Sequence, residues 1–262
     1  MSRSSSPDAS PLFMGSVAKC FQVLEALNQA SRPVGLTELA GFSGLDRSAV
    51  QRITHTLRVL GYLRQDPATK ALRLPGRMLE FGHTVLATHE LRERAQPQLQ
   101  ALNRRTGETV NLMELEGAEI VYVSRFPSVH AVSVDLHVGS RLPAFCTAAA
   151  RATLPRRDPA EALSHLKSAR RTRMTPLTVT DLNGLRDLLQ QARELGYALN
   201  DQEAFVGDIS VAAPLVDGRG HPVGAINIAV PSPRWNVQDV LVRLVPHLLR
   251  TAATINKELR YG

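Results

Sequence analysis

A short segment of the chain, from Arg47 to Arg77, concentrates positive charge. It contains seven basic residues and one acidic residue, Asp66, so its formal charge is +6 (7 − 1). The whole chain of 262 residues carries +7, so the remainder is close to neutral. Charge focused in this way is typical of a surface that binds a polyanion such as nucleic acid. The alternative is an ordinary solvated charged face, and the apolar pattern of the same region favours the first reading.

Three helices are predicted to position this charge. The first spans residues 16–30, with Ser16 as a candidate N-cap and one apolar stripe made of Val17, Cys20, Phe21, Leu24 and Leu27. The second runs from Leu36 to Ser43, Gly44 supplies the turn, and Asp46 can cap a third helix that extends to about Leu60. That third helix has its own apolar stripe, made of Val50, Ile53, Leu57 and Leu60. Gly61 is expected to end it.

The opposite face of the third helix is polar, and a basic hairpin follows it. Two segments, 62–65 and 72–74, flank a tip at 66–70, which predicts the wing of a winged helix-turn-helix. Side chains that can read base edges in the major groove are Ser48, Gln51, Arg52 and His55. Residues placed to hold phosphates are Thr37, Arg47, Lys70 and Arg73. The partner predicted from these residues is double-stranded operator DNA.

The rest of the chain changes period after a helical stretch. Pro75 opens a linker helix that reaches about His89, and 91–106 continues helically with an interruption at Pro97. Strands are then expected at 110–115, 119–125, 131–137, 209–216 and 223–230. Further helices are expected at 147–153, 158–170, 181–196 and from Asn236 onward, the last kinked at Pro246. Strands in two sets with helices between them predict an α+β domain with an antiparallel sheet.

These elements suggest four regions along the chain. They are a Ser/Pro-rich disordered tail at 1–15, a winged helix-turn-helix domain at 16–76, a linker helix at 77–90 and an effector-binding domain at 91–262. Leu79 and Leu86 of the linker helix could pack between two subunits or within one chain. The sequence contains no apolar run long enough to span a membrane and no signal-peptide core, which together favour a cytoplasmic protein without a membrane partner.

Enzymatic alternatives find little support in the residues. The usual nucleophile-elbow, phosphate-loop, dinucleotide and zinc-protease motifs are absent from the sequence. The sharpest candidate is a hydrolase with Cys146 as nucleophile, His130 or His137 as base and Asp135 as orienter. A buried, inert cysteine is the simpler reading, and two distant cysteines predict neither a metal site nor a disulfide. We expect no cofactor. A DNA-binding architectural protein without a ligand is a third alternative, against which the large neutral domain argues.

Residues 16–90 and 107–258 resemble the IclR family of bacterial transcription regulators. The resemblance is carried by the stretches LTELAGFSGLDRSAVQRITHTLRVLGYL, LRLPGRMLEFG, ETVNLMELEGAEIVYVSR, VGSRLPAFCTAAARATL, LTVTDLNGLRDLLQQARELGYALNDQE and ISVAAPLVDGRGHPVGAINIAVPSPR. Within the family, RLPAFCTAAAR and GYALNDQE are most similar to the subgroup that senses aromatic acids. The resemblance implies a winged helix, a linker helix and a GAF-like effector domain, assembled as homodimers or tetramers on operator DNA.

The resemblance also implies where an organic or aromatic acid would bind. A helix beginning near Thr147 would offer the backbone N–H groups of Ala148 and Ala149 to a carboxylate. The family's polar pocket residues correspond to Asn200, Ser210 and Asn227, with Phe145 and Cys146 nearby. This chain departs from the family pattern at Asn200, Ser210 and Ala150, where Asp, Cys and Gly are frequent. These departures leave the identity of the effector open.

Overall fold

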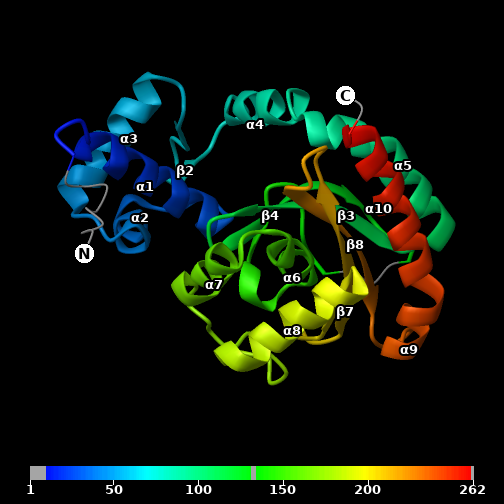
Figure 1. Ribbon diagram of the computed structural model, residues 1–262. Helices are drawn as coiled ribbons and strands as arrows, with labels where there is room; N and C mark the ends of the chain where they lie inside the picture. Colours follow the sequence, from blue (N-terminus) through cyan, green and yellow to red (C-terminus); the bar gives the residue numbers. More distant parts are fainter. Residues whose placement is uncertain (1–9, 131–133, 261–262) are drawn as a thin grey trace. The chain divides into compact units, whose positions relative to one another are not determined.

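Figure 1 shows the computed structural model, which describes residues 10–130 and 134–260. The chain forms two compact units, Met1–Thr88 and His89–Gly262. Residues 1–9 of the expected tail lie outside the described part of the chain, and Gly15, the last residue of that tail, already starts a helix.

The described part of the first unit, residues 10–88, contains four helices and a two-stranded sheet. Its elements are α1 (Gly15–Ala30), α2 (Leu36–Ser43), α3 (Arg47–Val59), β1 (Arg64–Gln65), β2 (Leu72–Arg73) and α4 (Met78–Ala87). A bridge between Val34 and Leu72 ties the segment before α2 to the hairpin. The hydrophobic core that joins α1, α2, α3 and the hairpin is built from Val23, Ala26, Leu27, Val34, Leu39, Val50, Leu57, Leu63 and Leu72. The order of elements is that of a winged helix.

Local signals fix the ends of α3 as expected. The Asp46 carboxylate accepts a hydrogen bond from the Ala49 N–H at 2.8 Å and so caps the helix. At the other end, Gly61 adopts a φ of 81°, in the left-handed region that favours glycine, and the Tyr62 N–H bonds back to the Leu57 carbonyl. The chain therefore leaves α3 directly into the hairpin.

Three expectations for the first unit are wrong. Met14, not Ser16, occupies the N-cap position of α1, and no side chain caps that end. Val17 and Phe21 are exposed, because the face of α1 that packs on α2 and α3 is centred on Val23 and Ala26 instead. Leu60 is also exposed, since it lies at the C-cap of α3 where the helix has turned away from the core.

The second unit is a three-layer α/β/α arrangement around one antiparallel sheet. Its strands are β3 (Thr109–Glu116), β4 (Glu119–Phe126), β5 (Arg141–Pro143), β6 (Ala198–Asp201), β7 (Asp208–Val216) and β8 (Pro222–Pro231). The order across the sheet is β5-β4-β3-β8-β7-β6, and every neighbouring pair is antiparallel. Helix content on both faces together with this sheet agrees with the expected α+β class.

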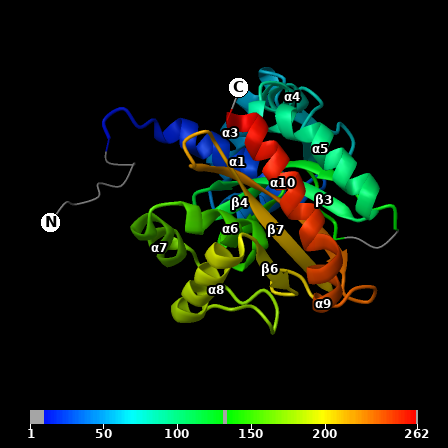
Figure 2. The ribbon, with the colours of Figure 1, turned by 45° about the vertical axis from the view of Figure 1, so that its right-hand side comes forward.

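Helices cover the two faces of the sheet differently. The helices and short helical turns are α5 (Glu90–Thr106), η2 (Ala144–Cys146), α6 (Ala148–Thr153), η3 (Leu154–Arg156), α7 (Pro159–Ser168), α8 (Leu182–Leu195), α9 (Val237–Asp239), the π turn η4 (Val240–Leu244) and α10 (Val245–Arg260). Helices α5 and α10 lie side by side on one face (Figures 1 and 2). Helices α6 and α8 pack on the other face, whose alanine-rich core leaves room beside them.

Several expectations for the second unit require correction. Residues 134–137 form no strand, and 131–133 lie outside the described residues; the edge of the sheet is formed by β5 instead. Helix α5 runs without interruption through Pro97, because its apolar stripe packs against the sheet strongly enough to tolerate one missing N–H bond. The irregularity expected at Pro246 takes the form of a π turn just upstream, and the helix continues from it through Pro246, the second residue of α10.

Candidate nucleic-acid interface and ligand cavity

The polar face of α3 is fully open to solvent. Ser48, Gln51, Arg52 and His55 are all exposed and lie on one face, spread over two turns of the helix. The Ser48 hydroxyl donates to the Asp46 carboxylate at 2.7 Å, which fixes it at the start of the helix with its lone pairs free to accept. A straight helix that presents donors and acceptors along one exposed face has the form needed to enter a major groove.

The hairpin that follows α3 is ordered around Asp66. Its carboxylate accepts hydrogen bonds from the N–H groups of Ala68 and Thr69 at 2.9 and 2.7 Å, and from the Thr69 hydroxyl at 2.9 Å. These bonds hold the pKa of Asp66 below its usual value, the Thr69 N–H contributing most. Lys70 sits at the tip with a φ of 59° and an exposed side chain. The only acidic residue of the basic segment is therefore used to shape the wing.

Six of the seven basic side chains in this segment make no hydrogen bond or ion pair with the described residues. They are Arg47, Arg52, Arg58, Arg64, Lys70 and Arg73, and all are exposed. Arg77 differs, since it donates to the Leu60 carbonyl at 2.9 Å and lies 4.5 Å from the centre of the Tyr62 ring. Thr37 is exposed in the first turn of α2. The positive charge thus surrounds the polar face of α3 and is not neutralised within the unit.

The second unit contains a cavity of about 410 Å³ on the α6 side of the sheet. Strands β3, β4, β7 and β8 form its floor, the start of α6 forms one wall, and the loop from Ala204 to Gly207 forms another. Apolar lining comes from side chains such as Met113, Ile120 and Phe205. A mostly apolar cavity with a few convergent polar groups is the usual form of a small-molecule site.

Six of the eight residues expected at the effector site line this cavity. They are Thr147, Ala148, Ala149, Asn200, Ser210 and Asn227. Phe145 and Cys146 are buried beside it in the core under α6 and are absent from its lining. Helix α6 has only six residues, so it is a short turn and a weak source of dipole for an anion.

Sequence reasoning missed Asn111, Tyr122, Arg125 and Asp208, which also line the cavity. The pairing of β3 with β4 shifts between Leu112 and Met113, so that Val123 is an extra residue on β4. Because of this bulge, Tyr122 and Arg125 both face the cavity although three positions separate them. Simple alternation would place them on opposite faces, and no signal in one sequence marks the bulge.

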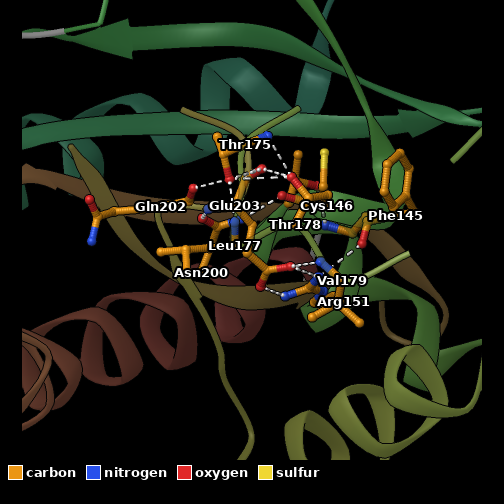
Figure 3. Close-up of polar contacts among 12 residues, drawn as sticks. Phe145, Cys146, Arg151, Thr175, Leu177, Thr178, Val179, Asn200, Gln202 and Glu203 are labelled. Atoms are coloured by element: carbon orange, nitrogen blue, oxygen red, sulfur yellow. Dashed lines mark hydrogen bonds and ion pairs between the residues drawn. The ribbon is translucent and has the colours of Figure 1, made fainter. Parts of the chain in front are cut away.

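A buried polar network supports the wall of the cavity (Figure 3). The Arg151 guanidinium of α6 forms an ion pair with the Glu203 carboxylate and donates to the Phe145 carbonyl at 3.1 Å. Glu203 also accepts from the Val179 N–H at 3.0 Å. These contacts bind the segment before α6, the segment before α8 and the loop after β6 into one body.

Asn200 belongs to this network as well as to the cavity. Its amide donates to the Cys146 carbonyl, and its oxygen accepts from the Glu203 N–H at 3.2 Å (Figure 3). Hydroxyls of Thr175 and Thr178 hold the same loop by donating to the carbonyls of Gln202 and Glu203, each at 2.7 Å. Both ends of the Asn200 amide are therefore engaged in positioning backbone.

Burial changes the acidity of three groups around the cavity. It raises the pKa of Asp208 to about 6, although nearby Arg125 favours the ionised form. It also raises the pKa of Tyr122 above its usual value, and it raises the pKa of Cys146 to about 11. Cys146 is completely buried in the core under α6, and its thiol donates a hydrogen bond to the Pro143 carbonyl. A thiol in this state is a poor nucleophile, so the hydrolase alternative has no support from geometry.

The described residues provide neither a metal-binding cluster nor a membrane-spanning helix. No group of three or more His, Cys, Asp or Glu side chains within 10–130 and 134–260 is arranged to hold a metal ion. No helix in those ranges has both the length and the apolar character needed to cross a membrane.

Comparisons with known proteins identify both domains. The IclR helix-turn-helix domain model matches residues 16–67, and the model of the C-terminal domain of bacterial IclR transcriptional regulators matches residues 83–257. The Pca regulon regulatory protein of Pseudomonas putida is 33% identical over 250 residues, covering 95% of this chain and 85% of the relative. The p-hydroxybenzoate hydroxylase transcriptional activator of Acinetobacter baylyi is 29% identical over 245 residues, covering 92% and 90%.

A solved structure shows the same likeness across the whole chain. It is an IclR homologue from Microbacterium hydrocarbonoxydans in complex with 4-hydroxybenzoate, with 25% identity, a TM-score of 0.78, and coverage of 94% of this chain and 100% of that one. The winged helix with its unneutralised basic face and the separate cavity domain are thus parts of a ligand-responsive, DNA-binding regulator and not of an enzyme. The chain belongs to the IclR family of bacterial transcriptional regulators.

Proposed function

We propose that this chain binds operator DNA in the bacterial cytoplasm through α3 and the wing, and that a small organic acid, aromatic in character, controls this binding from the cavity of the second unit. The observation that carries the DNA-binding part is the set of six exposed basic side chains around the polar face of α3, which make no hydrogen bond or ion pair with the residues that the structure describes. Regulators named for aromatic-acid pathways among the relatives support the effector class.

Two kinds of contact are proposed at the DNA. Ser48, Gln51, Arg52 and His55 read base edges from the exposed face of α3. Thr37, Arg47, Lys70 and Arg73 hold phosphates, which sets the register of the protein without reading sequence. The assignment predicts different consequences for one residue of each kind.

Arg52→Ala and Lys70→Ala separate these roles. The enriched duplex is one that the wild-type protein selects from random DNA. Arg52→Ala should weaken binding to this duplex by roughly 1–3 kcal/mol and should reduce the preference for one base at one position. Lys70→Ala should weaken binding to all duplexes and reduce the slope of log affinity against log salt by about one. Fluorescence anisotropy at several salt concentrations measures both, with Arg219→Ala, an exposed charge at the β7–β8 turn, as control. Equal losses on enriched and random duplexes for Arg52→Ala would contradict base reading.

The effector is proposed to contact the cavity lining. Thr147, Ala148, Ala149, Ser210 and Asn227 supply small or polar groups at its surface, while Asn200 keeps the wall in place. Phe145 and Cys146 are assigned a packing role behind it. The size of the cavity suits a single substituted ring.

Ala148→Leu tests this placement. Ala148 is buried and lines the cavity, so the larger side chain should take up ligand space and abolish the response of DNA binding to acids while leaving DNA affinity unchanged. Ala160→Leu, exposed on α7, is the matched control. A thermal-shift screen of small carboxylic acids identifies the ligand for the assay. An undiminished response in Ala148→Leu would remove the cavity as the effector site.

We also propose a homodimer in which the first units pair. Apolar side chains on α1 and α4 stay exposed in the chain, namely Met14, Val17, Phe21, Leu79, Phe81 and Val85. Two winged helices on a palindromic site combine their affinities, which one unit alone does not achieve. Val85→Lys should shift sedimentation toward monomer and weaken operator binding, whereas Val242→Lys, on η4 of the second unit, should not. An unchanged dimer in Val85→Lys would place the interface elsewhere.

A further inference from the structure

The cavity contains three charged side chains, and one of them is already neutralised. Glu108 accepts two hydrogen bonds from Arg234, at 2.8 and 2.6 Å, and one from the Trp235 indole at 3.0 Å. It therefore serves the packing of the chain after β8. Arg125 lies near enough to Asp208 to favour its ionised form, but no hydrogen bond or ion pair joins the two, and both remain available to a ligand.

Arg125 begins a chain of side-chain hydrogen bonds across three strands. Its guanidinium donates to the Asn111 oxygen at 3.1 Å and to the Val134 carbonyl at 2.9 Å. The Asn111 amide in turn donates to the Asn227 oxygen at 2.8 Å. The three residues occupy neighbouring strands, because Asn111 pairs with Arg125 on β4 and with Asn227 on β8.

This chain fixes the orientation of both amides. A guanidinium has only donors, so Asn111 must turn its oxygen toward Arg125 and its NH₂ group toward Asn227. Asn227 must then accept with its own oxygen, and its NH₂ group is left to face the cavity. Together with the charge of Arg125, this end of the cavity is suited to an oxygen that only accepts, such as that of a carboxylate.

Asp208 lies in a different part of the cavity from Asn227. It pairs with Pro231, four residues beyond Asn227 along β8, which places the two backbones about 13 Å apart along the strand. Its N–H bonds to the Phe205 carbonyl, but its carboxyl has no hydrogen-bond or ion-pair partner among the described residues. The Tyr122 hydroxyl, which also lines the cavity, has none either. A carboxylate left without a donor in a half-buried site is suited to a ligand that supplies one.

We propose that the effector carries a carboxylate at one end and a hydrogen-bond donor, a hydroxyl or an amine, at the other, with Arg125 and Asn227 receiving the carboxylate and Asp208 reading the donor. The assignment rests on the proposed acid-sensing function and deepens it. It divides the cavity into an end that accepts any aromatic acid and an end that selects among them. Ionised Asp208 is the better acceptor, and its raised pKa implies that this selection strengthens as the pH rises above about 6.

The experiment compares probes that differ only in the donor. Binding of 4-hydroxybenzoate, 3-hydroxybenzoate, 4-aminobenzoate, their fluoro counterparts and benzoate is measured on the full-length protein at pH 7.5. Trp235, the single tryptophan, reports binding by fluorescence because its indole contacts a cavity residue, and calorimetry checks the affinities. At least one donor-bearing acid should bind roughly 10- to 100-fold more tightly than its fluoro counterpart.

Variants then assign the preference to a residue. Asp208→Ala should remove the preference by weakening the donor-bearing acid alone, and retained binding of the fluoro acid shows that the variant is folded. Asn227→Asp, which replaces a donor by a second acceptor, should weaken all the acids. Asp187→Ala, an exposed carboxylate on α8, is the control and should change nothing.

These outcomes distinguish the role of Asp208 from the acid-sensing function. In one outcome the acids bind while donor-bearing and fluoro probes bind equally, and in another Asp208→Ala weakens both kinds of probe equally. Either result would contradict recognition of the donor by Asp208 and leave the acid-sensing function intact. If none of the acids binds the wild type, the acid-sensing function falls and the assignment falls with it.

Discussion

Asp208 makes a quantitative prediction that needs no ligand. Its carboxyl has a pKa of 3.8 in an unfolded chain and about 6 in the folded cavity, because burial opposes ionisation. Each pKa unit corresponds to about 1.4 kcal/mol, which sets a ceiling of about 3 kcal/mol on its cost to folding. Water in the cavity screens part of this, so we expect roughly 2 kcal/mol. Asp208→Asn removes the ionisable group and should recover that free energy.

The sign follows from the two pKa values. Well below pH 3.8 both states are protonated, and the variant and the wild type should be equally stable. As the pH rises from about 3 to about 7, the unfolded wild type loses the proton first, so its stability falls relative to the variant. Well above pH 6 the difference is complete and constant. For a unit of this size it corresponds to a Tm of the variant roughly 4–8 °C above that of the wild type.

Calorimetry of the full-length chain in buffers without carboxylic acids, at pH 4.5, 5.5, 6.5 and 7.5, measures this difference. Asp217→Asn is a control of opposite sign, since hydrogen bonds from the N–H groups of His221 and Arg219 lower the pKa of Asp217. The stabilising effect of the ionised Asp217 carboxylate is present above pH 4 and is lost as the pH falls, so the variant lacks this effect. If the stability difference between Asp208→Asn and the wild type is the same at pH 4.5 and at pH 7.5, burial of the Asp208 charge is not its origin.

Further variants test other contacts. In Gly224→Ala, a Cβ would lie 2.9 Å from the Met113 carbonyl oxygen, so the variant should lose roughly 1–3 kcal/mol in denaturant unfolding, the cost of overpacking against a backbone that cannot move aside. Glu203→Gln leaves the Arg151 charge buried without a counter-ion and should cost roughly 3–5 kcal/mol in the same assay. Asp66→Ala adds one net positive charge to the wing, yet it should weaken operator binding, because the tip loses three hydrogen bonds that order it.

Matched variants make these predictions specific. Gly82→Ala, in α4 with no atom near its Cβ, should be neutral or stabilising. Glu161→Gln breaks an exposed pair with Arg157 and should change stability little. Tighter operator binding by Asp66→Ala would indicate that net charge outweighs wing order, and Glu203→Gln with wild-type stability would mean that Arg151 finds another acceptor.

Elements with local signals were predictable from the sequence. Asp46 caps α3 and Gly61 ends it, and Asp181 and Gly196 do the same for α8. Each of these residues acts through its own backbone or through neighbours within a few positions, so one sequence contains the whole cause. The class of the fold followed from the change of period after residue 107.

Features that depend on distant partners were not predictable. The exposure of Val17 and Phe21 depends on which face of α1 meets α2 and α3. The uninterrupted course of α5 through Pro97 depends on the sheet beneath it. The segment 134–137 has the alternation of a strand because Val134 and Leu136 face the cavity, yet it pairs with no strand.

The candidate cavity shows the same division. Thr147 and Asn227 were identified through resemblance to a family whose motifs reflect its tertiary structure. Both residues line the cavity. Phe145 and Cys146 came from the same motif but lie behind the wall. Arg125 and Asp208 have no motif, and their meeting depends on the bulge in β4 and on the register of β7 with β8.

The extra residue in β4 bears on how such a receptor tolerates changes in the length of a strand. Removing Val123 would leave Ser124 directly after Tyr122, so the pairs Leu112–Ser124 and Asn111–Arg125 could form a regular ladder, and alternation would keep Tyr122 and Arg125 on one face. Loss of that codon would therefore straighten the strand without taking the cation away from the ligand. A deletion one position outside a bulge reverses the facing of every side chain beyond it, so the bulge marks the place where a lineage of sensors can vary strand length and keep its recognition chemistry.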